Sequence, residues 1–258
     1  MSTYVQLINN LDQLKLAKIK EYLPQYLDET IHKEKSFTEA LKELTDKEIE
    51  FREDRAALIN LTISHFPYHK GIQDFDFSYQ PSISKAQILD FCTLRFLETS
   101  DNLLFIGSSG VGKTHLATAI GIEASKRRVS TYFIHFNDLI TKIKRAYAEN
   151  RHEQVVKHYS KYKLLIIDEI GYLPIEKEYS NVFFQLIASR YERRSIIITT
   201  NQPLSKWGEV FNDNTIAAAI IDRLVHHSSI VKITGRSYRI KDKILVEEVD
   251  SDSKPKPF

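Results

Sequence analysis

The chain has 258 residues, of which 42% are hydrophobic, and its 36 lysines and arginines against 34 aspartates and glutamates give a net charge of +2. This composition is adequate for a packed core and excludes a disordered chain, and no apolar run is long enough for a membrane span. The lone cysteine, Cys92, excludes an internal disulfide and a cysteine-based metal site, and the N-terminus has no secretory pattern, so we expect a cytoplasmic protein without a membrane partner.

Residues 1–66 predict a small all-helical domain. They contain no glycine, and Pro24 is their only proline. Apolar residues recur at helical spacing in two stretches, and Ser36 followed by Glu39 predicts a capping box that opens the second stretch. The 9 basic against 12 acidic residues predict solvated helix faces. We expect this domain to serve partner binding or self-association, with DNA as a further candidate ligand.

Residues 67–82 predict a linker that carries four aromatic residues, Tyr68, Phe75, Phe77 and Tyr79. Their side chains can pack on the following domain alone or also flank an adenine ring, and packing alone is the favoured interpretation. Residues 83–246 then predict one α/β domain. Residues 247–258, acidic and then rich in lysine and proline, predict a disordered tail.

A complete phosphate-loop motif, GSSGVGKT, occupies residues 107–114. The apolar run 102–106 predicts a buried strand before it, and residues 115–120 predict a helix after it, which is the context this motif requires. Lys113 is expected to reach the β- and γ-phosphates, and the Thr114 hydroxyl to ligate Mg²⁺. We therefore predict ATP and Mg²⁺ as ligands, held by Gly107, Ser108, Ser109, Gly110, Val111, Gly112, Lys113 and Thr114.

Further strands are predicted at residues 131–134, 164–167, 196–200 and 230–233, alternating with helical patterns. This alternation predicts a parallel sheet with helices on both faces, whose ligands bind at the carboxyl ends of the strands. Asp168 and Glu169 end one such strand. Asp168 is suited to binding Mg²⁺, and Glu169 is suited to orienting and polarising the attacking water.

Asn201 directly follows the strand at residues 196–200. Its amide can hydrogen-bond the attacking water or the γ-phosphate, although Asn-Gln-Pro is also a good turn at a strand exit. An arginine completes many phosphoryl-transfer sites, because it stabilises the charge of the transition state. The sequence pattern alone does not rank the five candidates, Arg190, Arg193, Arg194, Arg223 and Arg239.

Five segments carry a resemblance to a known family: GSSGVGKTHLA (107–117), LLIIDEIGYLP (164–174), ITTNQP (198–203), IIDRL (220–224) and GRSYR (235–239). In these the chain resembles the IstB family, the ATPase helpers of insertion-sequence transposases, which is similar to the DnaC helicase loaders within the AAA+ initiator clade. The resemblance implies an AAA+ P-loop core with a central five-stranded parallel sheet and no full C-terminal lid. It further implies that Arg223 is an arginine finger acting across a subunit boundary and that Arg239 is a second sensor.

The basic stretch 136–163 is either a solvated helical face or a DNA surface. The initiator clade carries a helical insertion here that lines a DNA channel, so the resemblance implies that Lys142, Lys144 and Arg145 contact DNA phosphates with little sequence preference.

Three functions follow as hypotheses. The leading one is a DNA-stimulated ATPase that forms a homo-oligomer on ATP and duplex DNA and recruits or activates the transposase of the same element for target-site selection. The second is a loader of a replicative helicase. The third is a nucleotide-gated scaffold with negligible hydrolysis, against which Glu169 and the arginines argue.

Overall fold

A computed structural model describes residues 2–30, 35–171 and 173–240 of the chain. It divides into two compact units, Met1–Ile59 and Asn60–Phe258. The end of the predicted ATPase domain at 241–246 and the predicted tail at 247–258 lie outside the described residues.

The first unit contains α1 (Thr3–Gln13), α2 (Ala17–Thr30) and the greater part of α3 (Phe37–Ile63). The predicted capping box at the start of α3 is confirmed: Ser36 N–H donates to Glu39 Oε2 over 2.9 Å, and Glu39 N–H donates to Ser36 Oγ over 3.3 Å. A small core of Leu11, Ile19 and Leu23 joins the helices.

Glu48, buried on α3, fixes the start of α2. The first turn of a helix has N–H groups without intrahelical partners. The Glu48 carboxylate accepts from two of them, Lys18 N at 2.8 Å and Ile19 N at 3.2 Å, and also from Arg52 Nε at 2.8 Å. Burial raises the pKa of Glu48, but the hydrogen bonds from Arg52, Ile19 and Lys18 outweigh it and leave the pKa below its usual value.

The second unit is built on five parallel strands in the order β2-β3-β4-β1-β5. Their bounds are β1 (Asn102–Gly107), β2 (Thr131–His135), β3 (Leu164–Ile170), β4 (Ser195–Thr200) and β5 (Ser228–Ile233). The central strands read as continuous apolar runs, because helices cover both of their faces. The predicted fold class, a five-stranded parallel sheet flanked by helices, is confirmed.

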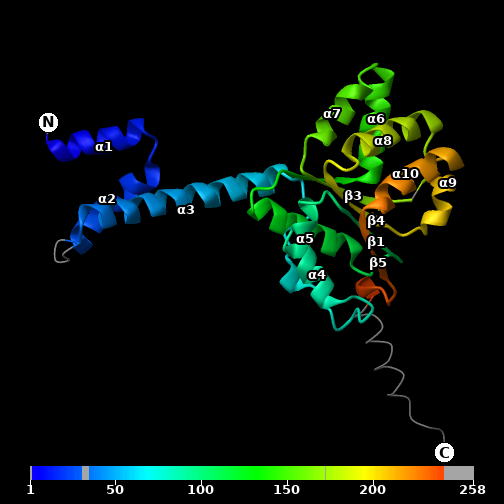
Figure 1. The fold of residues 1–258 in the computed structure, drawn as a ribbon, viewed down its shortest axis with the longest axis horizontal. Helices are drawn as coiled ribbons and strands as arrows, with labels where there is room; N and C mark the ends of the chain where they lie inside the picture. The colour runs from blue at the N-terminus through cyan, green and yellow to red at the C-terminus, as the bar shows by residue number, and fades with distance from the viewer. Residues whose placement is uncertain (1, 31–34, 172, 241–258) are drawn as a thin grey trace, which may run out of the picture. The chain divides into compact units, whose positions relative to one another are not determined.

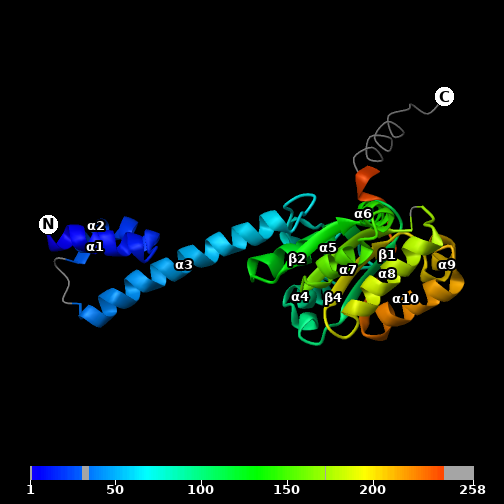
Figure 2. The same ribbon diagram turned by 90° about the horizontal axis from the view of Figure 1, so that it is seen from above.

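Alternate residues of each strand enter two separate cores. On one face, Leu103 and Phe105 pack with α4 (Lys85–Cys92) and α5 (Lys113–Lys126). On the other face, Leu104 belongs to the core formed with the remaining helices. Those helices are α6 (Phe136–Ala148), α7 (His152–Ser160), α8 (Lys177–Arg190), α9 (Trp207–Val210) and α10 (Asn214–His226). Figure 1 shows the two groups on opposite sides of the sheet, and α8 and α10 lie side by side in both views (Figure 2).

Residues 60–66, grouped with the N-terminal helices in the sequence prediction, lie in the second unit. The Ser64 carbonyl accepts from Phe133 N–H at 2.8 Å, and the Ser64 and Ser125 hydroxyls are 2.9 Å apart. Beyond β5, the described residues form a single 3-10 turn, Tyr238–Ile240, so the part of the chain that the structure describes contains no helical lid after the sheet. None of the described helices is both long enough and apolar enough to cross a bilayer.

We expect Glu48→Gln to destabilise the start of α2 by about 1–3 kcal/mol, because it replaces a charged acceptor and turns an amide toward two N–H donors. Amide hydrogen exchange at Lys18 and Ile19 in the full chain measures this, and it should quicken at least ~5-fold. The matched control is Glu50→Gln, which removes only an exposed ion pair with Lys47.

The pH dependence of the same exchange gives a second readout. Because the pKa of Glu48 is lowered on folding, its stabilisation is fully present above the ordinary value of 4.5 and is lost as the pH falls through the lowered pKa. Equal exchange in Glu48→Gln and the parent protein at neutral pH would contradict this role for Glu48.

Candidate active site

The phosphate loop joins the carboxyl end of β1, which lies between β4 and the edge strand β5, to the start of α5. Two of its glycines have backbone conformations that side chains rarely adopt, with φ of +80° at Gly110 and +97° at Gly112. A Cβ at Gly112 would lie 2.5 Å from the Phe75 ring, and one at Gly107 would lie 2.4 Å from the Ile233 carbonyl oxygen. The loop therefore needs glycine both for its conformation and for the closeness of its neighbours.

Lys113 is buried beneath this loop and ties it together. Its Nζ donates to the carbonyls of Gly107 and Ser108, each over 2.8 Å, which uses two of the three ammonium donors. Burial lowers the pKa of Lys113, and the charges of Asp168 and Glu169 oppose that shift.

The fully buried Asp168 carboxylate is the hub of the site. It accepts from Thr114 Oγ1 at 2.9 Å and from Thr199 Oγ1 at 2.5 Å, and His135 Nδ1 lies 3.2 Å away. The hydrogen bond to Asp168 raises the pKa of His135. These four residues come from β3, α5, β4 and β2, so one carboxylate joins three strands and the helix that follows the phosphate loop.

Glu169 reaches the same edge of the sheet through an irregularity in β3. In a regular strand, consecutive side chains point to opposite faces. Here the register with β4 shifts between Ile167 and Ile170, and Glu169 has a left-handed φ of +63°. Such a residue costs roughly 1–3 kcal/mol and is typical of functional sites. The Thr199 hydroxyl, which accepts from Glu169 N–H at 2.9 Å, helps to hold this conformation.

A cavity of about 330 Å³ lies above the loop. Residues 109–115 form one wall, the linker supplies residues that include Tyr68 and Phe75, and Glu169 and Arg239 also line the cavity. Phe75 also packs in the core behind the loop, so this aromatic residue both packs on the domain and faces the cavity.

The linker also fixes the segment that carries Arg239. The Tyr79 hydroxyl donates to the Ser237 carbonyl over 3.2 Å, and Gln80 Nε2 donates to the Arg236 carbonyl over 2.9 Å. Tyr238 N–H in turn donates to the Gly110 carbonyl over 2.9 Å. Sequence reasoning missed these contacts, because they join segments about 160 residues apart.

The structure separates the five arginines. Arg239 lines the cavity, whereas Arg223 on α10 does not. The Arg223 guanidinium donates to the Ala219 carbonyl and lies 4.8 Å from the Phe184 ring centroid. Arg190 is fully buried, and it donates to the carbonyls of Tyr159, Tyr162, Lys163 and Ser195.

Burial lowers the pKa of Arg190, and carbonyls of its own fold accept from both its Nη1 and its Nη2, so Arg190 does not suit the role of a finger. Arg193 and Arg194 lie between α8 and β4, at the opposite edge of the sheet from the loop. Asn201 is exposed directly after β4, next to the strand of the phosphate loop, and its role stays a prediction.

The three predicted DNA-contact residues lie on α6 but do not share one surface. Lys142 donates to the Tyr159 hydroxyl over 3.1 Å and lines a hollow between α6 and α7 together with Arg145, whose side chain is 85% exposed. Lys144 instead lies 3.1 Å from Glu176 and above the Tyr179 ring. The set therefore divides into a pair that lines one hollow, Lys142 and Arg145, and a separate lysine outside it. Arg145 has a carboxylate neighbour of its own, since its Nε lies 3.7 Å from Glu149 Oε1.

His135 and Thr199 are the functional neighbours that sequence reasoning missed. Both residues are at or near the carboxyl end of strands that flank β3, where side chains converge in a parallel sheet. That position was a usable signal, but many strands end in a histidine or threonine without such a role.

Comparisons with known proteins agree with this geometry. The family model of the IstB-like ATP binding protein matches residues 9–246. A protein of insertion sequence IS232 from Bacillus thuringiensis subsp. berliner, named as an ATP-binding protein, is 54% identical over 241 residues, which cover 93% of this chain and 96% of that protein.

Two solved structures, each 22% identical to this chain, share the fold. DnaI has a TM-score of 0.55 over 64% of this chain and 92% of its own. The DnaC helicase loader has a TM-score of 0.50 over 68% of this chain and 98% of its own. At this identity the likeness shows the AAA+ fold alone.

We expect Gly112→Ala to lower nucleotide affinity by at least ~10-fold, because the new Cβ needs an unfavourable φ and collides with the Phe75 ring. Titration with a fluorescent nucleotide measures the affinity. Ser109→Ala is the matched control, since Ser109 lines the same cavity without a positive φ and the substitution keeps the backbone N–H through which the loop would hold a phosphate. If Gly112→Ala binds nucleotide as the parent does, the loop does not need this conformation.

Proposed function

The chain belongs to the IstB-like ATP binding protein family, and from this membership we propose that it is an AAA+ ATPase of transposition. In this proposal it binds ATP and Mg²⁺, assembles with further copies of itself on duplex DNA, and recruits or activates the transposase of its element. Hydrolysis of ATP to ADP and phosphate then limits the lifetime of the assembly.

The observation that carries the proposal is the placement of Glu169 beside the hydrogen-bonded pair Thr114 and Asp168. A protein that only bound nucleotide would need the phosphate loop but not a strained residue that turns a carboxylate into the cavity. Glu169 is exposed there, able to accept a proton from a water molecule and to orient it toward a phosphate.

The residues present fit ATP and Mg²⁺. At Gly107, Gly110 and Gly112 a Cβ would collide with Ile233, Ser237 and Phe75, so only glycine lets the backbone of the loop keep this conformation, and the backbone N–H groups at the start of α5 favour an anion. Thr114 Oγ1 and the Asp168 carboxylate are adjacent oxygen donors, which is the chemistry that Mg²⁺ prefers. When bound, Mg²⁺ supplies neutralisation of phosphate charge. Lys113 stabilises the same charge, and Asp168 positions the Thr114 hydroxyl.

We propose that hydrolysis needs two subunits. Arg239 lines its own cavity and suits contact with the phosphates of its own nucleotide. Arg223 lies outside that cavity, half-buried on α10, and therefore suits delivery to a neighbouring subunit. A guanidinium placed at the transferring phosphoryl group is worth roughly 10³–10⁵ in rate.

We propose Lys142 and Arg145 as the DNA-contact pair. They line one hollow between α6 and α7, and their long side chains can reach phosphates. Such contacts position the protein on DNA without reading its sequence.

Partner binding is assigned to the N-terminal helices, which expose large apolar side chains such as Phe37 and Leu14, 80% and 66% exposed. We favour a transposase as this partner because the relative that is 54% identical is named for an insertion sequence. The likeness to a helicase loader is at the level of fold.

A mixing experiment tests hydrolysis between subunits. Arg223→Ala should bind nucleotide nearly as the parent does but lose turnover by ~10³-fold or more. Lys113→Ala should fail to bind nucleotide. Mixed, the two should recover part of the activity, because some interfaces pair an intact loop with an intact Arg223. Arg193→Ala is the control and should keep its turnover. Co-assembled mixtures that stay inactive would refute action between subunits.

A salt titration tests the DNA surface. Each phosphate contact contributes about −0.9 to the slope of log affinity against log salt on duplex DNA. We expect the double variant Lys142→Ala, Arg145→Ala to flatten this slope by about 1.8 per subunit that contacts DNA, and to a similar extent on unrelated sequences. Lys144→Ala is the matched control, since Lys144 lies outside the hollow lined by Lys142 and Arg145 and pairs with Glu176 instead. A double variant with the parent's affinity and slope would place the DNA surface elsewhere.

A further inference from the structure

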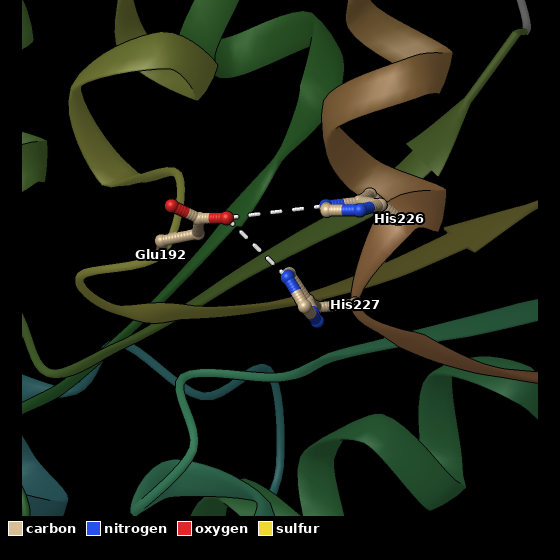
Figure 3. Close-up of side chains that lie close together, drawn as sticks. All are labelled: Glu192, His226 and His227. Atoms are coloured by element: carbon tan, nitrogen blue, oxygen red, sulfur yellow. Dashed lines mark ion pairs between the residues drawn. The ribbon is translucent and has the colours of Figure 1, made fainter.

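A second cluster of potential ligands lies far from the ATP cavity. Glu192 Oε1 is 3.3 Å from His227 Nε2 and 3.9 Å from His226 Nδ1, and the three side chains converge on one point (Figure 3). One ligand atom from each residue lies within 4.8 Å of the other two. Glu192 is in the loop between α8 and β4, and the histidines end α10, so the cluster lies at the edge of the sheet where the strands begin.

The backbone at this cluster is held from both sides. The loop of Glu192 follows the buried Arg190, whose carbonyl accepts from Arg193 N–H and Arg194 N–H, each over 3.0 Å. Glu192 itself has a φ of +56° within this turn. On the other side, the His227 carbonyl accepts from Asn102 N–H at the start of β1 over 2.8 Å. The three ligands therefore project from anchored positions.

Two imidazole rings and one carboxylate meet at this cluster. The ring centroids are only 4.1 Å apart, so nitrogen ligand atoms from both rings lie close to one carboxylate oxygen. The side chains are 47–56% exposed, and ion pairs at such exposure add little stability. A single cation at the centre satisfies all three groups at once.

We propose that Glu192, His226 and His227 bind a divalent transition-metal ion of the zinc type. Zn²⁺ binds imidazole nitrogen and carboxylate oxygen at about 2.0–2.2 Å, which places the ligand atoms of a tetrahedral site about 3.3 Å apart. The distances of 3.3 and 3.9 Å from Glu192 Oε1 to the two histidine nitrogens are close to this spacing. Because the side chains are exposed, small rotations can bring the longer distance to the value that a metal ion requires. Three protein ligands leave the fourth position to water. The two nitrogen ligands distinguish this site from the proposed Mg²⁺ site, where Thr114 and Asp168 supply oxygen ligands and only one imidazole, that of His135, lies nearby.

A hydrogen bond from Tyr191 competes with the proposed metal ion for one ligand atom, so a variant of Tyr191 tests the site. The Tyr191 hydroxyl hydrogen-bonds to His226 Nδ1 at 2.7 Å, the same nitrogen that faces Glu192. A metal ion must displace this hydroxyl from Nδ1. The variant Tyr191→Phe should therefore bind the ion at least as tightly as the parent.

The experiment is a Zn²⁺ titration of the metal-stripped full chain, without a histidine tag or ATP, in excess Mg²⁺. Calorimetry should give one ion per chain at this site, and Co²⁺ should bind there with a visible spectrum. Each of His226→Ala, His227→Ala and Glu192→Gln should weaken binding by about tenfold or more. His69→Ala, at another exposed histidine, should leave it unchanged. Unchanged thermal unfolding of the stripped variants confirms that they are folded.

Three results would overturn the assignment: no Zn²⁺ binding by the parent, equal binding by the His226→Ala, His227→Ala double variant, or a tenfold loss in Tyr191→Phe. Since ATP is absent from the titration, none of them bears on nucleotide binding.

Discussion

The buried carboxylate of Asp168 is the constraint on which the nucleotide site depends. A carboxylate removed from water is strongly destabilising unless hydrogen-bond donors replace the lost hydration. Thr114, Thr199 and His135 supply those donors from three different elements. The ends of β2, β3 and β4 and the first turn of α5 must therefore keep their relative positions. The same hydroxyl of Thr199 accepts from the backbone of Glu169, so the hub also holds the strained residue in place.

Packing behind the phosphate loop is the second constraint. The Phe75 ring lies where a side chain at Gly112 would be, and the segment after β5 closes on Gly110 through Tyr238. The linker thus contributes to the shape of the loop as well as to the wall of the cavity. Phe75 of the linker therefore restricts position 112 of the phosphate loop to glycine, although the two residues are far apart in the sequence.

The local parts of this site could be predicted from the sequence, because each rests on a short pattern. The phosphate loop, the strand that ends in Asp168 and Glu169, and the alternation of strands and helices need no knowledge of distant contacts. The burial of Arg190 could not be predicted, since its acceptors lie in the α7–β3 segment and at the start of β4. The pairing of Lys144 with Glu176 was hidden for the same reason: helical spacing places a residue on a face but does not show what packs against that face. Glu192 and the two histidines likewise converge only through the fold.

Asn102 joins the start of β1 to α10 and to β4. It is buried at the start of β1; its Nδ2 donates to the Leu224 carbonyl over 3.2 Å, and its Oδ1 accepts from Ile196 N–H over 2.9 Å. Leu224 directly follows Arg223 on α10, and β1 ends in the phosphate loop. One short strand therefore fixes the position of Arg223, the proposed finger, relative to the phosphate loop. The proposed catalysis between subunits would depend on these fixed positions, because a guanidinium misplaced by about 1 Å loses most of its effect on the transition state.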